Sequence, residues 1–349
     1  MGSVKLLDCT LRDGGYVNNW DYGMDAICGI LNRVLAAKVD IVEAGFIRDE
    51  QYNENRAVFP SVLLVDEITE KNRIKKDHAE LAVMAEIAHP IPLENIANAC
   101  ETNVDIIRVI VWKSKHTADG KVVDALHESY DYCKGIVEKG YKLCVQPNRT
   151  DQYTDTEFEA MIRLFAGLDP YAIYVVDSWG TMYSDDVLHY MELADKILPD
   201  TVSIGFHGHN NMMQAFSTAE KIIQRDFDRN IILDASVAGI GRGAGNLNLE
   251  LIARYLNKKC GAGYDLQPLY DIYDLYIKDL EKKYTWGSTV PFMVSAYRNA
   301  NPNYAAFFTD RLTVQEMDSV YDSMQGDDLV LYTGKLAEKY ARLGKELQI

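Results

Sequence analysis

Two histidines, two residues apart, end an apolar run near the middle of the chain, in the segment 203–210 (SIGFHGHN). The run predicts a buried strand, on which His207 and His209 share one face with their Cα atoms roughly 6–7 Å apart. Both imidazoles could then reach one metal ion. The alternative is a pair of hydrogen-bonded polar groups at a strand end, so the choice depends on whether other ligands lie nearby.

A carboxylate and a guanidinium follow the first apolar run of the chain, in the segment 8–16 (DCTLRDGGY). Asp13 is a hard oxygen ligand of the kind that divalent cations bind, and Arg12 next to it is a permanent cation. Strict strand alternation would send the two side chains to opposite sides. A surface ion pair is therefore the alternative interpretation of this dipeptide.

Further polar residues end other apolar runs. Glu43 needs a cationic partner if it lies inside a fold, because an isolated buried charge is very costly, and Arg12 is the expected partner. Asp177 and Ser178 end another run, and a glycine-rich segment, 234–246, ends the last. This segment lacks the Gly-Lys-Ser/Thr ending of a P-loop, so it indicates either tight turns or a close backbone approach to an anion or a metal site.

The apolar runs recur at regular intervals and alternate with amphipathic segments, which indicates a parallel sheet covered by helices. Eight such units within residues 1–260 predict an α/β fold, a TIM (β/α)8 barrel, rather than a doubly wound sheet. Active sites of such barrels are built from the loops that follow the strands. The expected strands are Val4–Cys9, Val39–Phe46, Leu81–Ala88, Asp105–Trp112, Tyr141–Gln146, Ala172–Val176, Val202–Phe206 and Ile231–Ser236.

Residues 261–349 lack strand signals and predict a C-terminal helical extension. Helices are expected at Leu266–Lys283, Thr313–Met324 and Gly334–Leu343, with a turn at Asn299–Tyr304. The first of them carries an aromatic stripe, which predicts packing against the barrel or against a second subunit. A homo-oligomer is therefore one of two interpretations.

Composition limits the partners. A net charge of -16 argues against nucleic acid and against an anionic membrane surface. The sequence contains no run of 18 apolar residues, so no membrane span is predicted, and no signal peptide is visible at the start. The six cysteines are scattered without a CxxC pair, which is typical of reduced thiols and predicts a cytoplasmic location.

The motifs together resemble one known group. Asp8-x-Thr10-Leu11-Arg12-Asp13-Gly14, Glu43-x-Gly45-Phe46, His207-Gly208-His209-Asn210 and the segment Gly239–Asn246 occur in this order at four strand ends. The combination resembles the DRE-TIM metallolyase superfamily, which includes 4-hydroxy-2-oxovalerate aldolase, isopropylmalate synthase and hydroxymethylglutaryl-CoA lyase. The segments 176–178 and 234–246 are most similar to the aldolase branch.

The resemblance implies one divalent ion, Mn(II) or Mg(II), bound by Asp13, His207 and His209, with Asn246 as a fourth or water-mediated ligand. It also implies that Arg12 stabilises oxyanion charge and that Glu43 orients Arg12. Glu250, one helical turn after Asn246, is expected to support the site from behind.

The sequence departs from the family at two places. The aldolases have a histidine, acting as general base, three residues after the metal-binding aspartate, and the synthases and the lyase have glutamine, whereas this chain has Tyr16. The base is therefore open between Tyr16, His116 and a metal-bound hydroxide. The lyase cysteine of the last strand loop is absent between Gly239 and Asn246, which argues against that reaction.

The predicted function is a metal-dependent carbon–carbon lyase or aldolase that acts on a 2-oxo acid and an aldehyde through an enolate. Alternatives are a Claisen-type synthase of an acyl-CoA and a 2-oxo acid, resembling isopropylmalate synthase, and a catalytically silent ligand-binding or scaffold barrel. Arg12, Asp177, Ser178 and His116 are the expected substrate-binding residues. Arg149 and Arg242 are either ordinary ion-pair arginines or binders of a second carboxylate or a phosphate, and the resemblance implies a dehydrogenase partner.

Overall fold

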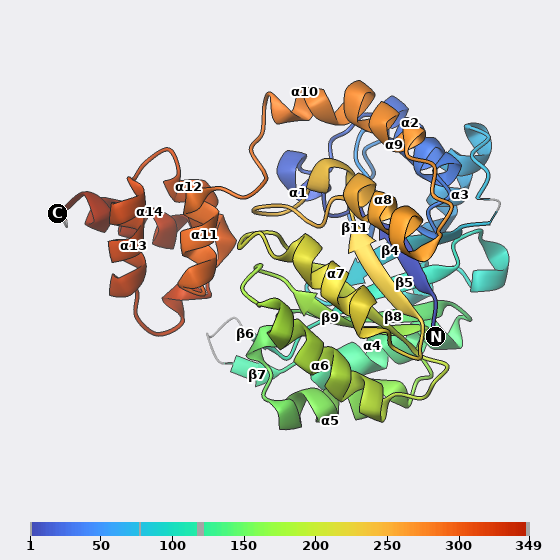
Figure 1. Ribbon diagram of the computed structural model, residues 1–349, viewed down its shortest axis with the longest axis horizontal. Helices are drawn as coiled ribbons and strands as arrows, with labels where there is room; N and C mark the ends of the chain where they lie inside the picture. Colours follow the sequence, from blue (N-terminus) through green and yellow to red (C-terminus); the bar gives the residue numbers. More distant parts are fainter. Residues whose placement is uncertain (1, 77, 117–121, 347–349) are drawn as a thin grey trace.

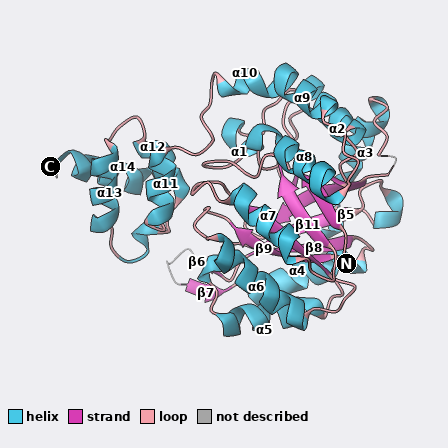
Figure 2. Ribbon diagram, viewed as in Figure 1, coloured by secondary structure: helices cyan, strands magenta, loops and turns pink. Residues whose placement is uncertain are grey.

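The computed structural model describes residues 2–76, 78–116 and 122–346, with the side chains of 115, 116 and 122 outside the description. Within these ranges, eight parallel strands close a barrel that helices surround (Figures 1 and 2). Their order is β1-β11-β10-β9-β8-β5-β4-β2, and β2 pairs again with β1 to complete the circle. The predicted TIM barrel with C-terminal helices is confirmed. The strands are β1 Val4–Asp8, β2 Ile41–Ile47, β4 Glu80–Glu86, β5 Ile106–Val111, β8 Lys142–Pro147, β9 Ala172–Asp177, β10 Ser203–Gly208 and β11 Ile231–Ala235, with β3 Val58–Phe59 beside β2 and a β6–β7 hairpin at Ser114–His116 and Val122–Asp124.

Helices follow the strands and cover the outside of the barrel (Figure 2). Their starts carry local signals, such as the reciprocal hydrogen bonds between Thr154 and Glu157 that begin α5. The helices around the barrel are α1 Gly15–Asn18, α2 Met24–Ala36, α3 Val62–Lys71, α4 Leu126–Glu138, α5 Asp155–Ala166, α6 Ser184–Ile197, α7 Ala215–Arg225 and α8 Leu249–Cys260. The later ones are α9 Gln267–Ile272, α10 Lys278–Glu281, α11 Val290–Tyr297, α12 Pro302–Phe308, α13 Val314–Ser323 and α14 Gly334–Glu346.

The barrel interior is filled by alternate residues of its strands. Leu7, Ala82, Cys144 and Ile232 belong to a buried cluster that is separate from the cluster between strands and helices. The ring of Tyr174 fills the centre, and it fits only because Gly205 faces it, since a Cβ there would lie 2.4 Å from the ring. The strands are not apolar throughout, because charged side chains occupy the inward positions nearer their carboxyl ends.

The segment that follows the barrel packs back onto it. A π-helical turn, Tyr273–Ile277, joins α9 to α10 and runs beside α2. The Tyr276 hydroxyl lies 3.2 Å from Nη1 of Arg33, whose guanidinium lies 5.5 Å from the tyrosine ring. Of the two interpretations of the aromatic stripe, the structure shows packing against the barrel.

Helices α11 to α14 form a second packed unit beside the barrel (Figure 1). Its own buried cluster includes Tyr304, Phe308, Val320 and Tyr340. The main cluster of the barrel extends to Ile277, so the two cores favour a division between residues 277 and 294. The predicted domain division at residue 260 stays a prediction.

Two of these helices correct the sequence-based expectation. Residues 299–304, expected to be a turn, include the start of α12, and α11 was not expected. Pro302 is the first residue of α12, and Pro291 is the second residue of α11. Proline is tolerated in the first turn of a helix because its missing N–H has no intrahelical partner there.

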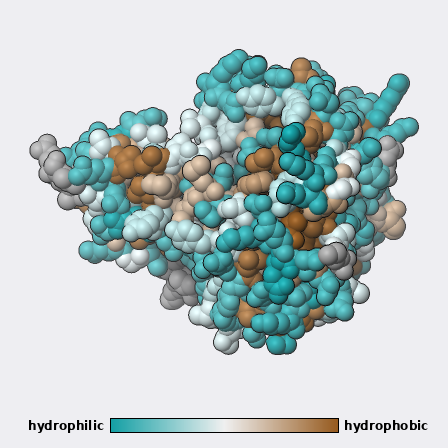
Figure 3. Space-filling model, in the orientation of Figure 1, coloured by the Kyte–Doolittle hydropathy of each residue, from teal (hydrophilic) through white to brown (hydrophobic). Residues whose placement is uncertain are grey.

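The surface drawn in Figure 3 is mostly hydrophilic, with the hydrophobic areas divided into separate patches. In the described part of the chain, no helix combines the length and the apolar character needed to cross a bilayer.

Candidate active site

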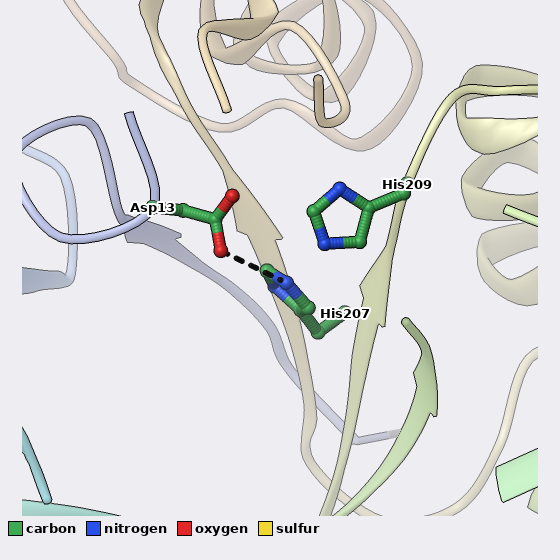
Figure 4. Close-up of side chains that lie close together, drawn as sticks. All are labelled: Asp13, His207 and His209. Atoms are coloured by element: carbon green, nitrogen blue, oxygen red, sulfur yellow. Dashed lines mark ion pairs between the residues drawn. The ribbon is translucent and has the colours of Figure 1, made fainter. Parts of the chain in front are cut away.

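Asp13, His207 and His209 come together at the carboxyl end of the barrel (Figure 4). Asp13 lies in the turn after β1, His207 lies in β10, and His209 follows β10 directly. One ligand atom of each residue lies within 4.8 Å of the others, and all three side chains are buried. The distance from His207 Nε2 to Asp13 Oδ2 is 3.6 Å. A carboxylate and two imidazoles that converge in this way form a candidate site for a divalent metal ion.

Each histidine is oriented by a partner on its other nitrogen. His207 Nδ1 lies 2.9 Å from Asp234 Oδ2, and His209 Nδ1 lies 3.1 Å from the carbonyl oxygen of Arg242. These contacts leave both Nε2 atoms for the centre of the site, as in protein metal sites whose imidazoles are held by an outer partner.

Burial and neighbouring charges tune the ligands. Burial lowers the pKa of His209 to about 4, so its ring is neutral at neutral pH and can act as a ligand. Burial alone would lower the pKa of His207, but its contacts with Asp13 and Asp234 raise it above the ordinary value. Burial alone would raise the pKa of Asp13, but Arg12 and the histidines hold it well below its usual range. Asp13 is therefore an anion at neutral pH, which suits it to bind a cation.

Asn246 supplies a further observation that fits a metal. Its Nδ2 donates to Asp13 Oδ1 and to the carbonyl oxygen of Ile240, both at 3.1 Å. Its Oδ1 is buried and has no hydrogen-bond partner within the described residues. A buried amide oxygen without a donor is rare, and a cation or a metal-bound water beside the trio would satisfy it. The four residues predicted as metal ligands therefore lie in one cluster.

Arg12 and Glu43 lie next to the trio, as the sequence predicts. Arg12 forms an ion pair with Asp13, and its Nε donates to Glu43 Oε2 at 2.8 Å. Only 3% of Arg12 is exposed, and Glu43 is fully buried. The carboxylates on both sides raise the pKa of Arg12 further, although burial opposes this, so the guanidinium is permanently charged. Glu43 fixes the direction in which Arg12 points.

Two buried charges of this site were missed by the sequence analysis. Arg108, in the middle of β5, lies with its Nη1 2.8 Å from Glu43 Oε2 and also forms an ion pair with Asp234 of β11. Asp234 in turn holds His207. The sequence feature that could have predicted them is a single arginine inside the apolar segment 106–111 (IIRVIV), because an isolated charge in a buried strand needs partners.

A pocket opens above the trio, and we call it the metal cavity. Tyr16, on α1, lies on its wall with 37% of its surface exposed. Partial burial and the Glu86 carboxylate raise the pKa of its phenol to about 12, so the phenol is protonated at neutral pH. This argues for a hydrogen-bond or proton donor rather than a base, and its predicted catalytic role stays a prediction. The cavity is lined by Arg12, Asp13, Tyr16, Met84, Ile110, Gln146, Asn148, Val176, Ser178, His207, His209 and Arg242.

The other expected substrate-binding residues differ in their placement. Ser178 lines the metal cavity, and its hydroxyl donates to Asn148 Oδ1 at 2.9 Å. Asp177 does not line it, because its carboxylate accepts the backbone N–H groups of Thr181 and Met182 and holds the loop before α6. His116 ends β6, and its side chain lies outside the described residues. Substrate contact by these residues stays a prediction.

Glu250 stands behind the glycine-rich turn. Its Oε2 accepts the backbone N–H of Ala238 at 3.1 Å, and its Oε1 accepts from Asn248 Nδ2 at 3.2 Å. It therefore supports the segment that carries Asn246, in the position that the sequence predicted.

Sequence comparison defines the class. Residues 3–276 match the HMGL-like family, so the chain belongs to that family, and the predicted resemblance is confirmed. The chain is 34% identical to a 4-hydroxy-2-oxovalerate aldolase from Pseudoalteromonas translucida, over 77% of this chain and 74% of the relative. It is 25% identical to an oxaloacetate decarboxylase from Mycobacterium tuberculosis, over 76% and 74% of the two chains.

Solved structures agree on the fold. The N-terminal domain of a putative aldolase from Bacteroides vulgatus superposes with a TM-score of 0.68 and 24% identity, over 87% of this chain and 96% of the other. The HMG-CoA lyase from Brucella melitensis superposes with a TM-score of 0.59 and 16% identity, over 81% of this chain and all of the other. At these identities the likeness shows a shared fold and nothing about the reaction.

Proposed function

We propose that this protein is a metal-dependent lyase of the aldolase type, which cleaves or forms a carbon–carbon bond of a 2-oxo acid through an enolate. The observation that carries the proposal is the convergence of Asp13, His207 and His209 beside the buried guanidinium of Arg12. Membership of the HMGL-like family and relatives named as aldolases support the same class.

The residues present fit a divalent ion, which Asp13, His207, His209 and Asn246 would hold. When bound, such an ion supplies a Lewis acid that polarises the oxygen atoms of a 2-oxo acid. The family resemblance implies Mn(II) or Mg(II), and the two oxygen donors, from Asp13 and Asn246, suit these ions.

Arg12 is the group that would stabilise the enolate oxygen. It lines the metal cavity, and its ion pairs with Asp13 and Glu43 hold its guanidinium in place before substrate arrives. A preorganised cation in a site of low dielectric stabilises developing negative charge without a reorganisation cost.

The proton donor is proposed to be Tyr16, because its phenol is protonated at neutral pH and lines the metal cavity. The side-chain amide of Gln146 adds a hydrogen-bond donor. Its Nε2 is buried without a partner in the described part of the chain, and the residue lines the same cavity. We infer that Gln146 binds a substrate oxygen.

The test uses metal-free protein and pyruvate in D2O. With added Mn(II) or Mg(II), deuterium should replace the methyl protons of pyruvate, as followed by NMR, because enolisation needs only the oxo acid half of the reaction. Chelation should stop the exchange, and His209→Ala should abolish it. Exchange that is indifferent to chelators would contradict the proposal.

An aldehyde as second substrate and a dehydrogenase partner are proposed from the family resemblance. A homo-oligomer stays a prediction, because the aromatic stripe packs against the barrel. A cytoplasmic location is proposed because all six cysteines are free thiols, which suits a reducing compartment.

A further inference from the structure

A second cavity adjoins the metal cavity, and we call it the distal cavity. It lies between the catalytic end of the barrel and the helical unit α11–α14, whose residues Asn301, Leu331 and Tyr332 form one wall. Asn148 and Arg242 line both cavities, so the two are neighbours along one path. A substrate bound at the metal site could therefore extend into the distal cavity.

Arg149 is the main polar group of the distal cavity. It is only 4% exposed, and its Nη1 has no hydrogen-bond partner among the described residues. The rest of the guanidinium is fixed. Its Nε and Nη2 form an ion pair with both carboxylate oxygens of Asp151, at 2.8 and 2.5 Å, and Nη2 also donates to Asn299 at 2.7 Å. Its Cζ lies 3.4 Å from the ring centre of Trp179. The free N–H groups of Nη1 are therefore held in place for an acceptor.

A second unpartnered donor belongs to another residue of the same lining. The indole Nε1 of Trp112 is buried without a partner in the described structure, and Trp112 also lines the distal cavity. Arg242 stands at the entrance, where its Nη2 donates to Asn301 Oδ1 at 3.3 Å. No carboxylate lies among the described lining residues. Buried donors without acceptors favour a ligand that brings acceptors with it, and a negative charge adds to this preference.

We propose that the distal cavity binds an acidic group, a carboxylate or a phosphate, at the far end of the substrate that the metal site processes. The inference rests on the proposed function and adds the substrate class, a 2-oxo acid aldol product whose tail carries a second anion. Arg149 and Trp112 donate to the anion, and Arg242 contributes charge at the passage between the cavities.

The test compares the release of pyruvate from 4-hydroxy-2-oxo acids of equal length whose tails end in a methyl, a carboxylate or a phosphate. The wild-type protein should show a kcat/KM at least about tenfold higher for an acidic tail, because hydrogen bonds to charged groups contribute about 1.5–3 kcal/mol. Arg149→Met should reduce the ratio of acidic to neutral substrate towards one, mainly through KM. Comparison of the two anions identifies which one the cavity prefers.

Trp112→Phe removes the indole donor but keeps an aromatic ring, and it should lower the same ratio by a smaller factor. Arg298→Met is the matched control, because Arg298 pairs with Asp318 and Asp322 in the helical unit and does not line the distal cavity. Its ratio should equal that of the wild type.

Equal kcat/KM for acidic and neutral tails in the wild type would overturn the inference, as would an unchanged ratio in both Arg149→Met and Trp112→Phe. Deuterium exchange into pyruvate does not involve a substrate tail, so it tests the proposed function independently of the distal anion site. Metal-dependent exchange together with a ratio of one rejects only the distal anion site, whereas absent exchange rejects the proposed function and this inference with it.

Discussion

At the scale of single residues, Arg12 combines burial with a permanent charge, two features that rarely occur together. It is almost fully buried, and yet it lines a cavity and carries a permanent charge. A metal ion bound to Asp13 would leave Glu43 and Asp13 compensating this charge only in part. Arg12 is therefore placed to respond to charge that develops on a substrate.

Arg12→Ala should lower kcat by a factor on the order of 10²–10³, which is typical for loss of one preorganised oxyanion-stabilising donor. Mn(II) should still bind, because Asp13, His207 and His209 remain. Steady-state kinetics and a manganese titration measure the two effects. Arg12→Lys retains the charge but not the fork between two carboxylates, so it should recover little activity. Wild-type turnover in Arg12→Ala would disprove the role of Arg12 in stabilising the enolate oxygen.

Tyr16 has a different expected behaviour. Because the pKa of its phenol is raised to about 12, it loses its proton only far above neutral pH. Tyr16→Phe should lower kcat, by at least about tenfold if the phenol donates a proton, and leave any limb of the pH–rate profile between about pH 6 and 9 in place. Loss of such a limb in the variant would instead identify Tyr16 as the base.

At the scale of elements, the glycine-rich turn after β11 positions the ligands by close backbone approach. A Cβ at Gly241 would lie 2.2 Å from Asn246 Nδ2 and 2.7 Å from Asp13 Oδ1. The backbone N–H of Arg242 donates to the same Asp13 oxygen at 3.1 Å. The turn therefore needs a residue without a side chain at position 241.

Gly241→Ala should weaken metal binding by about 10–100-fold, the usual effect of disturbing groups that orient ligands. Isothermal titration with Mn(II) measures it. Gly263→Ala is the matched control, because a Cβ at Gly263 meets no atom within 4 Å. Equal affinity in the two variants would contradict the packing argument.

The opposite end of the barrel is held by charges that link β4 to β8 and β1. Glu80 forms ion pairs with Lys142 and Lys5 and accepts a hydrogen bond from Tyr171 at 2.7 Å. Burial alone would raise the pKa of Glu80, but its contacts with Lys142 and Tyr171 lower it below the ordinary value. A depressed pKa means that the stabilisation is present above the ordinary pKa and disappears as pH falls through the depressed one.

Glu80→Gln should therefore lower the free energy of unfolding near neutral pH by about 1 kcal/mol, and the difference from wild type should shrink as pH falls below the ordinary glutamate pKa of about 4.3. Urea unfolding at several pH values measures this difference. Glu159→Gln, which removes an exposed partner of Arg163, should change stability by less than about 0.5 kcal/mol. A difference for Glu80→Gln that grows on acidification would contradict the sign.

At the scale of the whole molecule, the barrel and the helical unit have separate cores that meet beside the catalytic end. Asn299 and Asn301 of the helical unit bind Arg149 and Arg242 of the barrel. The helical unit therefore contacts both arginines of the proposed distal anion site, although it supplies none of the proposed metal ligands.

Phe308→Ala should destabilise the helical unit by about 3–5 kcal/mol, because Phe308 is fully buried and stacks on Tyr304. Hydrogen exchange should accelerate in residues 290–346, while the barrel strands stay protected and manganese affinity is retained. Phe307→Ala, at a half-buried neighbouring position, should have a smaller effect. Equal loss of protection in the barrel would show that the two cores unfold as one.

The sequence alone was sufficient for the barrel and for naming residues that the structure brings together as a candidate metal site. Apolar runs at regular intervals predict the strands, because strand formation depends on local side-chain patterns, and parallel strands bring their carboxyl ends to one face. Asp13, His207 and His209 were therefore candidates from their positions near strand ends, and the family resemblance joined them with Asn246 into one set.

Only the tertiary structure showed that Arg108 and Asp234 meet inside the barrel. Arg108 and Asp234 lie 126 residues apart in the chain, and their pairing depends on the closure of the barrel, which no local pattern encodes. The distal cavity likewise forms where the helical unit packs against the barrel. Such long-range packing depends on shape and on the sum of many weak contacts, so residue types and spacing leave it undetermined.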